Sequence, residues 1–118
     1  MSKETVFSIA QWHQETFPDC ELEDQIAKFD EENKEYEESN SMEELADMFI
    51  VACGICRFDT ITAMAYFQIV GELLGDREEI AATVLFNIAI EKKMAKNRSR
   101  VWEKTTQGSY HHVECNNF

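Results

Sequence analysis

Two pairs of acidic side chains at helical spacing are the residues of this 118-residue chain best suited to chemistry. Glu32 and Glu35 lie three positions apart, and Glu44 and Asp47 repeat that spacing, so each pair falls on one side of a helix. The second pair continues an apolar line on a segment with hardly any polar face, where an ionised carboxylate without a partner costs several kcal/mol. Four oxygen donors from two neighbouring antiparallel helices suit a hard divalent cation such as Mg²⁺.

The same acidic residues also admit a purely structural interpretation. Glu44 follows Ser41 by three positions and is able to complete a capping box, and residues 31–38 fit a solvated helix face. Asn40 with Glu43 makes an equally good cap for the next helix. That second cap leaves the Glu44 pair one turn deeper, where capping does not explain both carboxylates.

A row of basic and amide side chains lies further along the chain. Lys93, Asn97, Arg100 and Lys104 are spaced by four, three and four positions, which places them on one helix face. Arginine offers bidentate donors to a phosphate and lysine offers a point charge, so the row suits phosphate binding. The alternative is that these cations gather near a helix C-terminus because the helix dipole favours them there. A metal site and a phosphate site together describe a site for a polyphosphate.

Five helices must position these side chains. Apolar periodicity, the proline at position 18 and capping residues predict helices over residues 6–17, 22–36, 42–58, 59–75 and about 76–104, the last opening on a capping box of Asp76 and Glu79. Residues 105–118 are expected to form an irregular tail. The sequence therefore predicts a single all-α domain over residues 1–118, most simply a four-helix bundle with one additional helix.

Composition narrows the class of protein. The net charge is −12, yet 44% of the residues are hydrophobic, which is too many for a disordered acidic tail. Residues 19–47 hold 13 carboxylates against two lysines. A nucleic acid polymer is an unsuitable partner for such a chain, because polyanions bind through lysine and arginine. No signal segment or membrane-spanning apolar run is evident and the cysteines do not resemble a disulfide framework, so we expect a cytoplasmic protein without membrane partners.

Several stretches resemble a known family. The letters FDEENKE over residues 29–35, followed by ELAD over residues 44–47, resemble the EExxE…ExxD signature of the all-α nucleoside triphosphate pyrophosphohydrolases, or MazG-like proteins. Similarity to the phage dATP/dGTP diphosphohydrolases, the MazZ family, extends over FSIAQWH at residues 7–13, Lys93-Met94 with Asn97, Arg100 and Trp102, and GSYHH at residues 108–112. The eight residues between Glu35 and Glu44 make a tighter connection than in many MazG-like proteins.

The resemblance implies an enzyme that converts a purine deoxynucleoside triphosphate, dGTP or dATP, to the monophosphate and pyrophosphate. A metal-activated water would attack the α-phosphorus, with Mg²⁺ as cofactor and Mn²⁺ as a substitute. The implied metal ligands are Glu32, Glu35, Glu44 and Asp47. Glu31 would support these ligands or act as the base for the water, which makes Glu31, Glu32 and Glu35 the implied catalytic residues. The implied phosphate-binding residues are Lys28, Lys93, Asn97 and Arg100.

The resemblance also implies an assembly and a location. Family members form dimers or tetramers with sites completed across subunits, so a homodimer or homotetramer is expected, in the host cytoplasm for a phage-encoded member. Two further substrate contacts stay open: Trp12 stacks on the base or fills the core, and Tyr110, with His111, closes over the nucleotide or belongs to an exposed tail. The base preference and the number of metal ions are not set by these residues.

Two other interpretations remain. The chain could be a catalytically silent helical module that binds nucleotide or mediates oligomerisation. Cys53 and Cys56 have the spacing of a zinc pair that His111, His112 and Cys115 would complete, but a pair in the middle of an apolar helix is more typical of close helix packing. His13 is expected at the surface or an interface.

Overall fold

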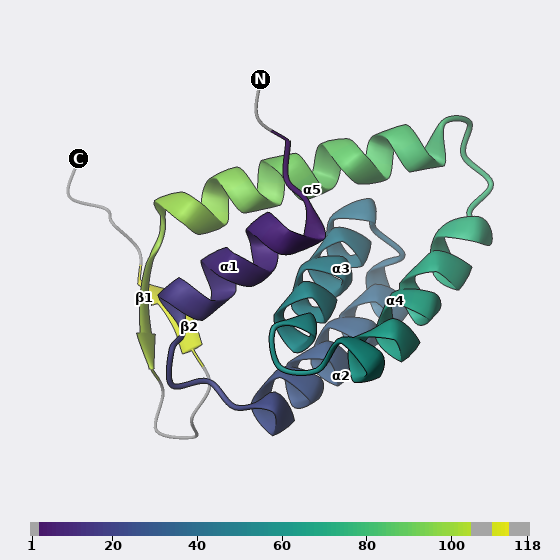
Figure 1. The fold of residues 1–118 in the computed structure, drawn as a ribbon. Coiled ribbons are helices and arrows are strands. Elements are labelled where there is room, and N and C mark those ends of the chain that lie inside the picture. The colour runs from purple at the N-terminus through teal and green to yellow at the C-terminus, as the bar shows by residue number, and fades with distance from the viewer. Residues whose placement is uncertain (1–2, 105–109, 114–118) are drawn as a thin grey trace.

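The computed structural model describes the backbone of residues 3–104 and 110–113, and the side chains of residues 3–100 and of Trp102. Five helices are followed by a small antiparallel sheet (Figure 1). Their bounds are α1 Val6–Thr16, α2 Leu22–Ser39, α3 Met42–Cys56, α4 Thr60–Gly75, α5 Ala82–Ser99, β1 Val101–Lys104 and β2 Tyr110–Val113. The predicted helical class is confirmed for residues 6–99, and the two strands follow them.

Helix α3 is the central element, because α1, α2, α4 and α5 all pack against it (Figure 1). Leu45, Met48 and Ile55 of α3 are 0% exposed. The apolar sequence of this helix is what allows it to be covered on so many sides. Glu44 and Asp47 of this helix therefore lie at the edge of the core, whereas Glu43 is exposed.

The connection between α2 and α3 is made by two residues with separate capping roles. Asn40 ends α2 in the left-handed conformation, with φ of 52°, and its N–H donates to the carbonyl of Tyr36. Ser41 begins α3, and its hydroxyl accepts from the N–H of Glu44 at 3.2 Å. The prediction that Asn40 caps α3 is thus wrong: Asn40 tolerates the left-handed conformation that the sharp reversal requires.

The fourth helix is capped as predicted, but the fifth begins later. Asp59 accepts from the N–H groups of Ile61 and Thr62 and so caps α4. Helix α5 starts at Ala82 and not at Asp76. The capping box is absent because Arg77 takes the carboxylate of Glu79 in an ion pair at 2.8 Å.

Arg77 ties this loop to the turn between α2 and α3. Its guanidinium donates to the hydroxyl of Tyr36 at 2.8 Å and to the carbonyl of Asn40 at 3.0 Å. These contacts hold the residues before α5 against the turn between α2 and α3. A helical path from Asp76 would remove them.

The C-terminal part differs from the expectation of a helix to about Lys104 and an irregular tail. Helix α5 ends at Ser99, and β1 pairs with β2 so that Val101 lies opposite Val113. The indole N–H of Trp102 donates to the carbonyl of Asn97 at 3.1 Å and satisfies one of the last helical carbonyls. Valine, tryptophan and tyrosine favour strands, which accounts for the sheet.

None of the helices described here combines the length and the apolar character that crossing a membrane requires.

Candidate functional site

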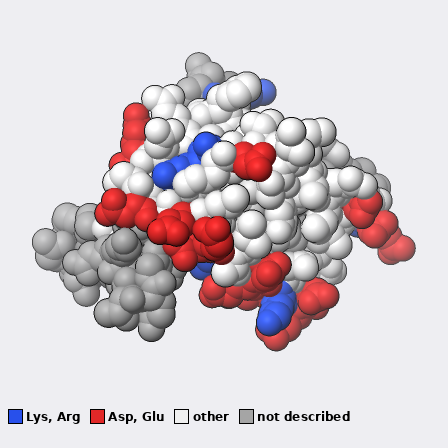
Figure 2. Space-filling model, turned by 60° about the horizontal axis from the view of Figure 1, so that its bottom comes forward, with Lys and Arg blue, Asp and Glu red and all other residues white. Residues whose placement is uncertain are grey.

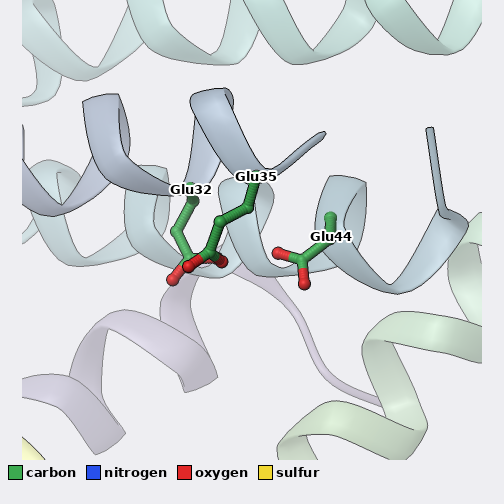
Figure 3. A group of neighbouring side chains, drawn as sticks. All are labelled: Glu32, Glu35 and Glu44. Atoms are coloured by element: carbon green, nitrogen blue, oxygen red, sulfur yellow. The ribbon is translucent and has the colours of Figure 1, made fainter. Parts of the chain in front are cut away.

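Three of the four predicted metal ligands come together where α2 and α3 face each other. One carboxylate oxygen each from Glu32, Glu35 and Glu44 lies within 4.8 Å of the other two. Figure 3 shows the two side chains from α2 and the one from α3 pointing toward a common point. Glu32 is 7% exposed, Glu44 is half-buried and Glu35 is exposed. The short connection after Asn40 sets the two helices in the register that produces this group.

In this cluster of three glutamates, two carboxylate oxygen atoms have no hydrogen-bond partner among the described residues. The Oε2 atoms of Glu32 and Glu44 are buried and make no hydrogen bond to any described residue. A buried acceptor without a partner is costly, and a divalent cation would satisfy both atoms at once. The donor set, three carboxylates with oxygen ligands only, fits Mg²⁺ or Mn²⁺.

Burial and like charge act together on these carboxyls. Burial raises the pKa of Glu32 to about 7, with Lys28 opposing the rise and Glu44 and Glu35 adding to it. Burial also raises the pKa of Glu44, and the charges of Asp47 and Glu35 contribute. The site therefore carries more negative charge than its own surroundings neutralise, which favours a cation.

The fourth predicted ligand, Asp47, is engaged elsewhere. Its Oδ2 lies 3.3 Å from Nζ of Lys93, and within the described part of the chain it is not a member of the group of three. Burial raises the pKa of Asp47 to about 6, Lys93 opposes the rise and Glu32 adds to it. Asp47 thus lies near the group but is paired with a cation from α5, and its role as a ligand stays a prediction.

Lys28 links the group to the exposed face of α2. Its Nζ lies 3.2 Å from Glu32 Oε1 and 3.9 Å from Glu31 Oε1. Burial disfavours the charge of Lys28, but Glu32 and Glu31 outweigh it and raise the pKa. Glu31 is 63% exposed in its side chain, so it lies outside the group of three. On the face shown in Figure 2, acidic side chains outnumber basic ones.

A cavity of about 280 Å³ adjoins these residues. It brings together many residues that the sequence singled out: Lys28, Glu32, Asp47, Lys93, Asn97, Arg100 and Trp12. Lys93, Asn97 and Arg100 therefore line the same cavity as Glu32, whereas Lys104 lies on β1, beyond the end of α5 at Ser99. The predicted contact of Tyr110, like those of His111 and His112, concerns a side chain outside the described residues.

Aromatic side chains line another part of the cavity. Trp12 makes edge-to-face contacts with Phe17 at 5.4 Å and Trp102 at 6.2 Å between ring centroids. Trp12 is 8% exposed, so it belongs to the core and also lines the cavity. Stacking of Trp12 on a base stays a prediction.

His13 is buried, which corrects the expectation of a surface or interface residue. It is 4% exposed, and its two ring nitrogens lie 2.9 Å from Nη1 of Arg57 and 3.0 Å from Oε1 of Gln25. Burial lowers its pKa to about 4, and the charge of Arg57 contributes. Gln25 and Arg57 were not singled out by the sequence. The glycine at position 54, in the middle of an apolar helix, is the one local sign of a close approach there.

The cysteines of the described residues are free thiols. Cys53 is 0% exposed and burial raises its pKa, which fits the expected packing role. The other members of the alternative zinc set lie outside the described side chains.

Comparisons of the chain with protein-family models, curated proteins and solved structures found no match.

Proposed function

We propose that this protein is a Mg²⁺-dependent nucleoside triphosphate pyrophosphohydrolase that converts purine deoxynucleoside triphosphates, dGTP or dATP, to the monophosphate and pyrophosphate. One observation carries the proposal. A cluster of three glutamate side chains, two of which have a buried oxygen without a hydrogen-bond partner, adjoins a cavity lined by Lys28, Lys93 and Arg100. Carboxylate oxygens without a partner suit a divalent metal ion. The basic side chains suit the phosphate groups that such a metal ion accompanies. The fold we propose is the MazG-like four-helix bundle with an additional helix.

In this proposal Glu32, Glu35 and Glu44 would hold Mg²⁺, which would neutralise charge on the triphosphate and activate a water. Mn²⁺ would substitute. Water attacks the α-phosphorus, its proton passes to a carboxylate such as Glu31, and the bond from the α-phosphorus to the bridging oxygen breaks so that pyrophosphate leaves.

The ion pair between Lys93 and Asp47 gives the proposal a natural order of events. A phosphate group entering the cavity competes for Lys93, because it offers the same kind of charged acceptor as Asp47. Transfer of Lys93 to the phosphate releases the Asp47 carboxylate. Asp47 would then be available as a fourth ligand of the metal, and Asn97 and Arg100 would contact the phosphates.

We also propose that the protein assembles as a homodimer or homotetramer through α4 and α5. Only Ala63 and Val70 of α4 are buried, whereas Ile61 is 79% and Met64 is 63% exposed. The apolar residues Val84, Leu85 and Ile88 of α5 are also exposed. Exposed apolar side chains gathered on two helices are typical of an interface, and a second copy of the chain is the partner we propose.

The test is incubation of the protein with each common ribo- and deoxynucleoside triphosphate and Mg²⁺, with pyrophosphate and orthophosphate detected separately. We expect pyrophosphate from purine deoxynucleotides, and none from a Glu32→Gln variant. Glu38→Gln, an exposed carboxylate on the same helix, serves as the matched control and should retain turnover. Absence of turnover for every purine triphosphate would contradict the proposal, and binding without turnover would favour the catalytically silent module. Orthophosphate alone would indicate a different phosphatase.

A further inference from the structure

A chain of hydrogen bonds on one side of the cavity has its direction set by Arg57. A guanidinium has no acceptor, so at 2.9 Å from Arg57 Nη1 the His13 Nδ1 atom must accept. The same arginine donates to the carbonyls of His13 and Phe17, at 3.1 and 2.9 Å, which fixes its position. Since the imidazole is neutral, its proton is on Nε2. Nε2 therefore donates to Gln25 Oε1 at 3.0 Å.

The orientation of the Gln25 amide follows from that proton. Oε1 accepts from His13, and the Cys20 thiol has both Oε1 at 3.6 Å and the carbonyl of Glu21 at 3.5 Å within reach of its one hydrogen. Nε2 donates to the carbonyl of Val51 at 3.2 Å. A flipped amide would place N–H against N–H at His13 and oxygen against oxygen at Val51. Among the residues that the structure describes, the second N–H of Gln25 has no acceptor.

Gly54 shows that the position of this amide is imposed by packing. A Cβ at residue 54 would lie 2.4 Å from Gln25 Nε2 and 3.0 Å from His13 Cδ2. A glycine inside a helix costs roughly 1 kcal/mol relative to alanine. This glycine therefore lies at the position of α3 where the Gln25 amide packs too closely for a larger residue.

Gln25 lies beside the aromatic side chains of the cavity, because its partner His13 contacts Trp12 and Phe17. It lines the cavity and lies seven positions before Glu32 on α2, which corresponds to about 10 Å along the helix. The aromatic side chains of Trp12, Phe17 and Trp102 line this region as well. With the triphosphate among the cations, as the proposed function has it, the base lies here.

We propose that Gln25 determines base specificity, its remaining N–H donating to a carbonyl oxygen of the base. The site then prefers oxo bases, such as guanine, hypoxanthine and uracil, over the amino bases adenine and cytosine. An amino group at that place would face a donor with another donor and leave both unsatisfied. The inference rests on the proposed function for the placement of the triphosphate.

The test is binding to the wild-type protein, in the presence of Mg²⁺, of nucleotides whose α,β-bridge is an imido group and cannot be hydrolysed. The α,β-imido triphosphates of deoxyinosine and deoxyadenosine compare 6-oxo with 6-amino, and those of deoxyuridine and deoxycytidine compare 4-oxo with 4-amino. We expect the oxo member of at least the purine pair to bind about tenfold more tightly by calorimetry. Equal binding, or tighter binding of the amino member, overturns the inference but not the proposed function. If none of the four binds, both are overturned.

Two variants place the preference on Gln25. Gln25→Met has a similar size but no N–H and should bind deoxyinosine and deoxyadenosine analogues equally, as should Gly54→Ala, which displaces the amide. Gln68→Met, on the exposed face of α4, is the matched control and should keep the wild-type preference. An undiminished preference in a folded Gln25→Met protein overturns the inference. Should that variant fail to fold, the wild-type comparison of the purine pair decides alone.

Discussion

At the scale of single residues, Glu32 combines features that a structural ion pair does not need. One of its oxygens pairs with Lys28 at 3.2 Å and the other is buried without a partner, facing the group that also contains Glu35 and Glu44. A purely structural pair would be more stable with both oxygens satisfied. The unsatisfied atom is the feature of Glu32 that the proposed metal ion would account for.

Replacement of Glu32 by glutamine should stabilise the metal-free protein while it abolishes metal binding. Ionising this buried carboxyl is unfavourable, since its pKa is raised to about 7, and a neutral amide of the same shape is able to donate to a neighbouring carboxylate. We expect a gain on the order of 1–2 kcal/mol at pH 8, from urea unfolding in chelator, and no heat of Mg²⁺ binding by calorimetry. Glu38→Gln should change neither quantity. A loss of stability in Glu32→Gln would show that the carboxylate is structural.

The stability of the metal-free protein should fall between pH 6.5 and pH 8. The folded-state pKa of Glu32, about 7, lies above its unfolded value, so the folded protein holds a proton that it loses as the pH rises. The loss corresponds to on the order of 1 kcal/mol over this range. His13, with a folded-state pKa of about 4, acts in the opposite sense, mainly below about pH 7, and so offsets only part of this loss.

This pH dependence is measured by urea unfolding in chelator at half-unit steps. Excess Mg²⁺ should reverse the slope, because the deprotonated carboxylates bind it better. In Glu32→Gln the decline should largely disappear. A flat profile for the wild-type protein would contradict the raised pKa.

At the scale of elements, the reversal between α2 and α3 determines the geometry of the carboxylate group. Ser41 caps α3 through the N–H of Glu44, so the same residue that supplies a carboxylate is anchored through its backbone at the helix start. Asn40 completes the reversal in the left-handed conformation. Capping and the proposed metal binding are thus compatible at Glu44, because the cap uses its backbone N–H and leaves its side chain available.

Removal of the Ser41 cap should weaken the metal site as well as the helix. Ser41→Ala should cost about 1 kcal/mol of stability, as loss of an N-cap does, and should weaken Mg²⁺ binding because the first turn of α3 carries Glu44. Asp59→Ala removes the corresponding cap of α4, away from the carboxylate group, and provides the control. It should lower the midpoint of urea unfolding by a similar amount without changing the calorimetric Mg²⁺ affinity. If both variants changed Mg²⁺ binding equally, the Ser41 cap would have no specific role in the metal site, and the prediction would be wrong.

The sequence predicts those elements whose signals are local. The apolar seam of α2, the apolar run of α3 and the Asp59 cap all act within a few residues, and their helices begin at or within one residue of the expected positions. The start of α5 depends on Arg77 reaching Tyr36 and Asn40, about 40 residues away in the chain. Contacts between residues so far apart in the chain produce no periodic pattern in the sequence.

The same distinction applies to the candidate site. Helical spacing is sufficient to predict that Glu32, Glu35 and Glu44 meet, since the two pairs lie on adjacent helices. It does not predict that Asp47 pairs with Lys93 from α5. Nor does it show that His13 is buried, because the partner that holds it, Arg57, is 44 positions away.

At the scale of the whole molecule, the charge of −12 separates into two parts. Most acidic residues of α2, such as Glu37 and Glu38, are exposed and need only solvent. The cluster of Glu32, Glu35 and Glu44 at the junction with α3 is different. It includes buried oxygens beside a cavity that lysine and arginine side chains also line. The molecule thus places its unneutralised charge next to the residues suited to a phosphate.

An exposed apolar surface on α4 leads to a prediction about assembly. Ile61 and Met64 lie one turn apart on α4 and are largely exposed, so a carboxylate at either position should leave the subunit folded but separate the subunits. We expect the wild-type protein to be a dimer or tetramer by light scattering and the double variant Ile61→Glu, Met64→Glu to be a monomer with helical content unchanged by circular dichroism. Gln68→Glu, an exposed polar position on the same helix, should remain oligomeric. A wild-type monomer, or a double variant with unchanged mass, would show that this face is not the interface.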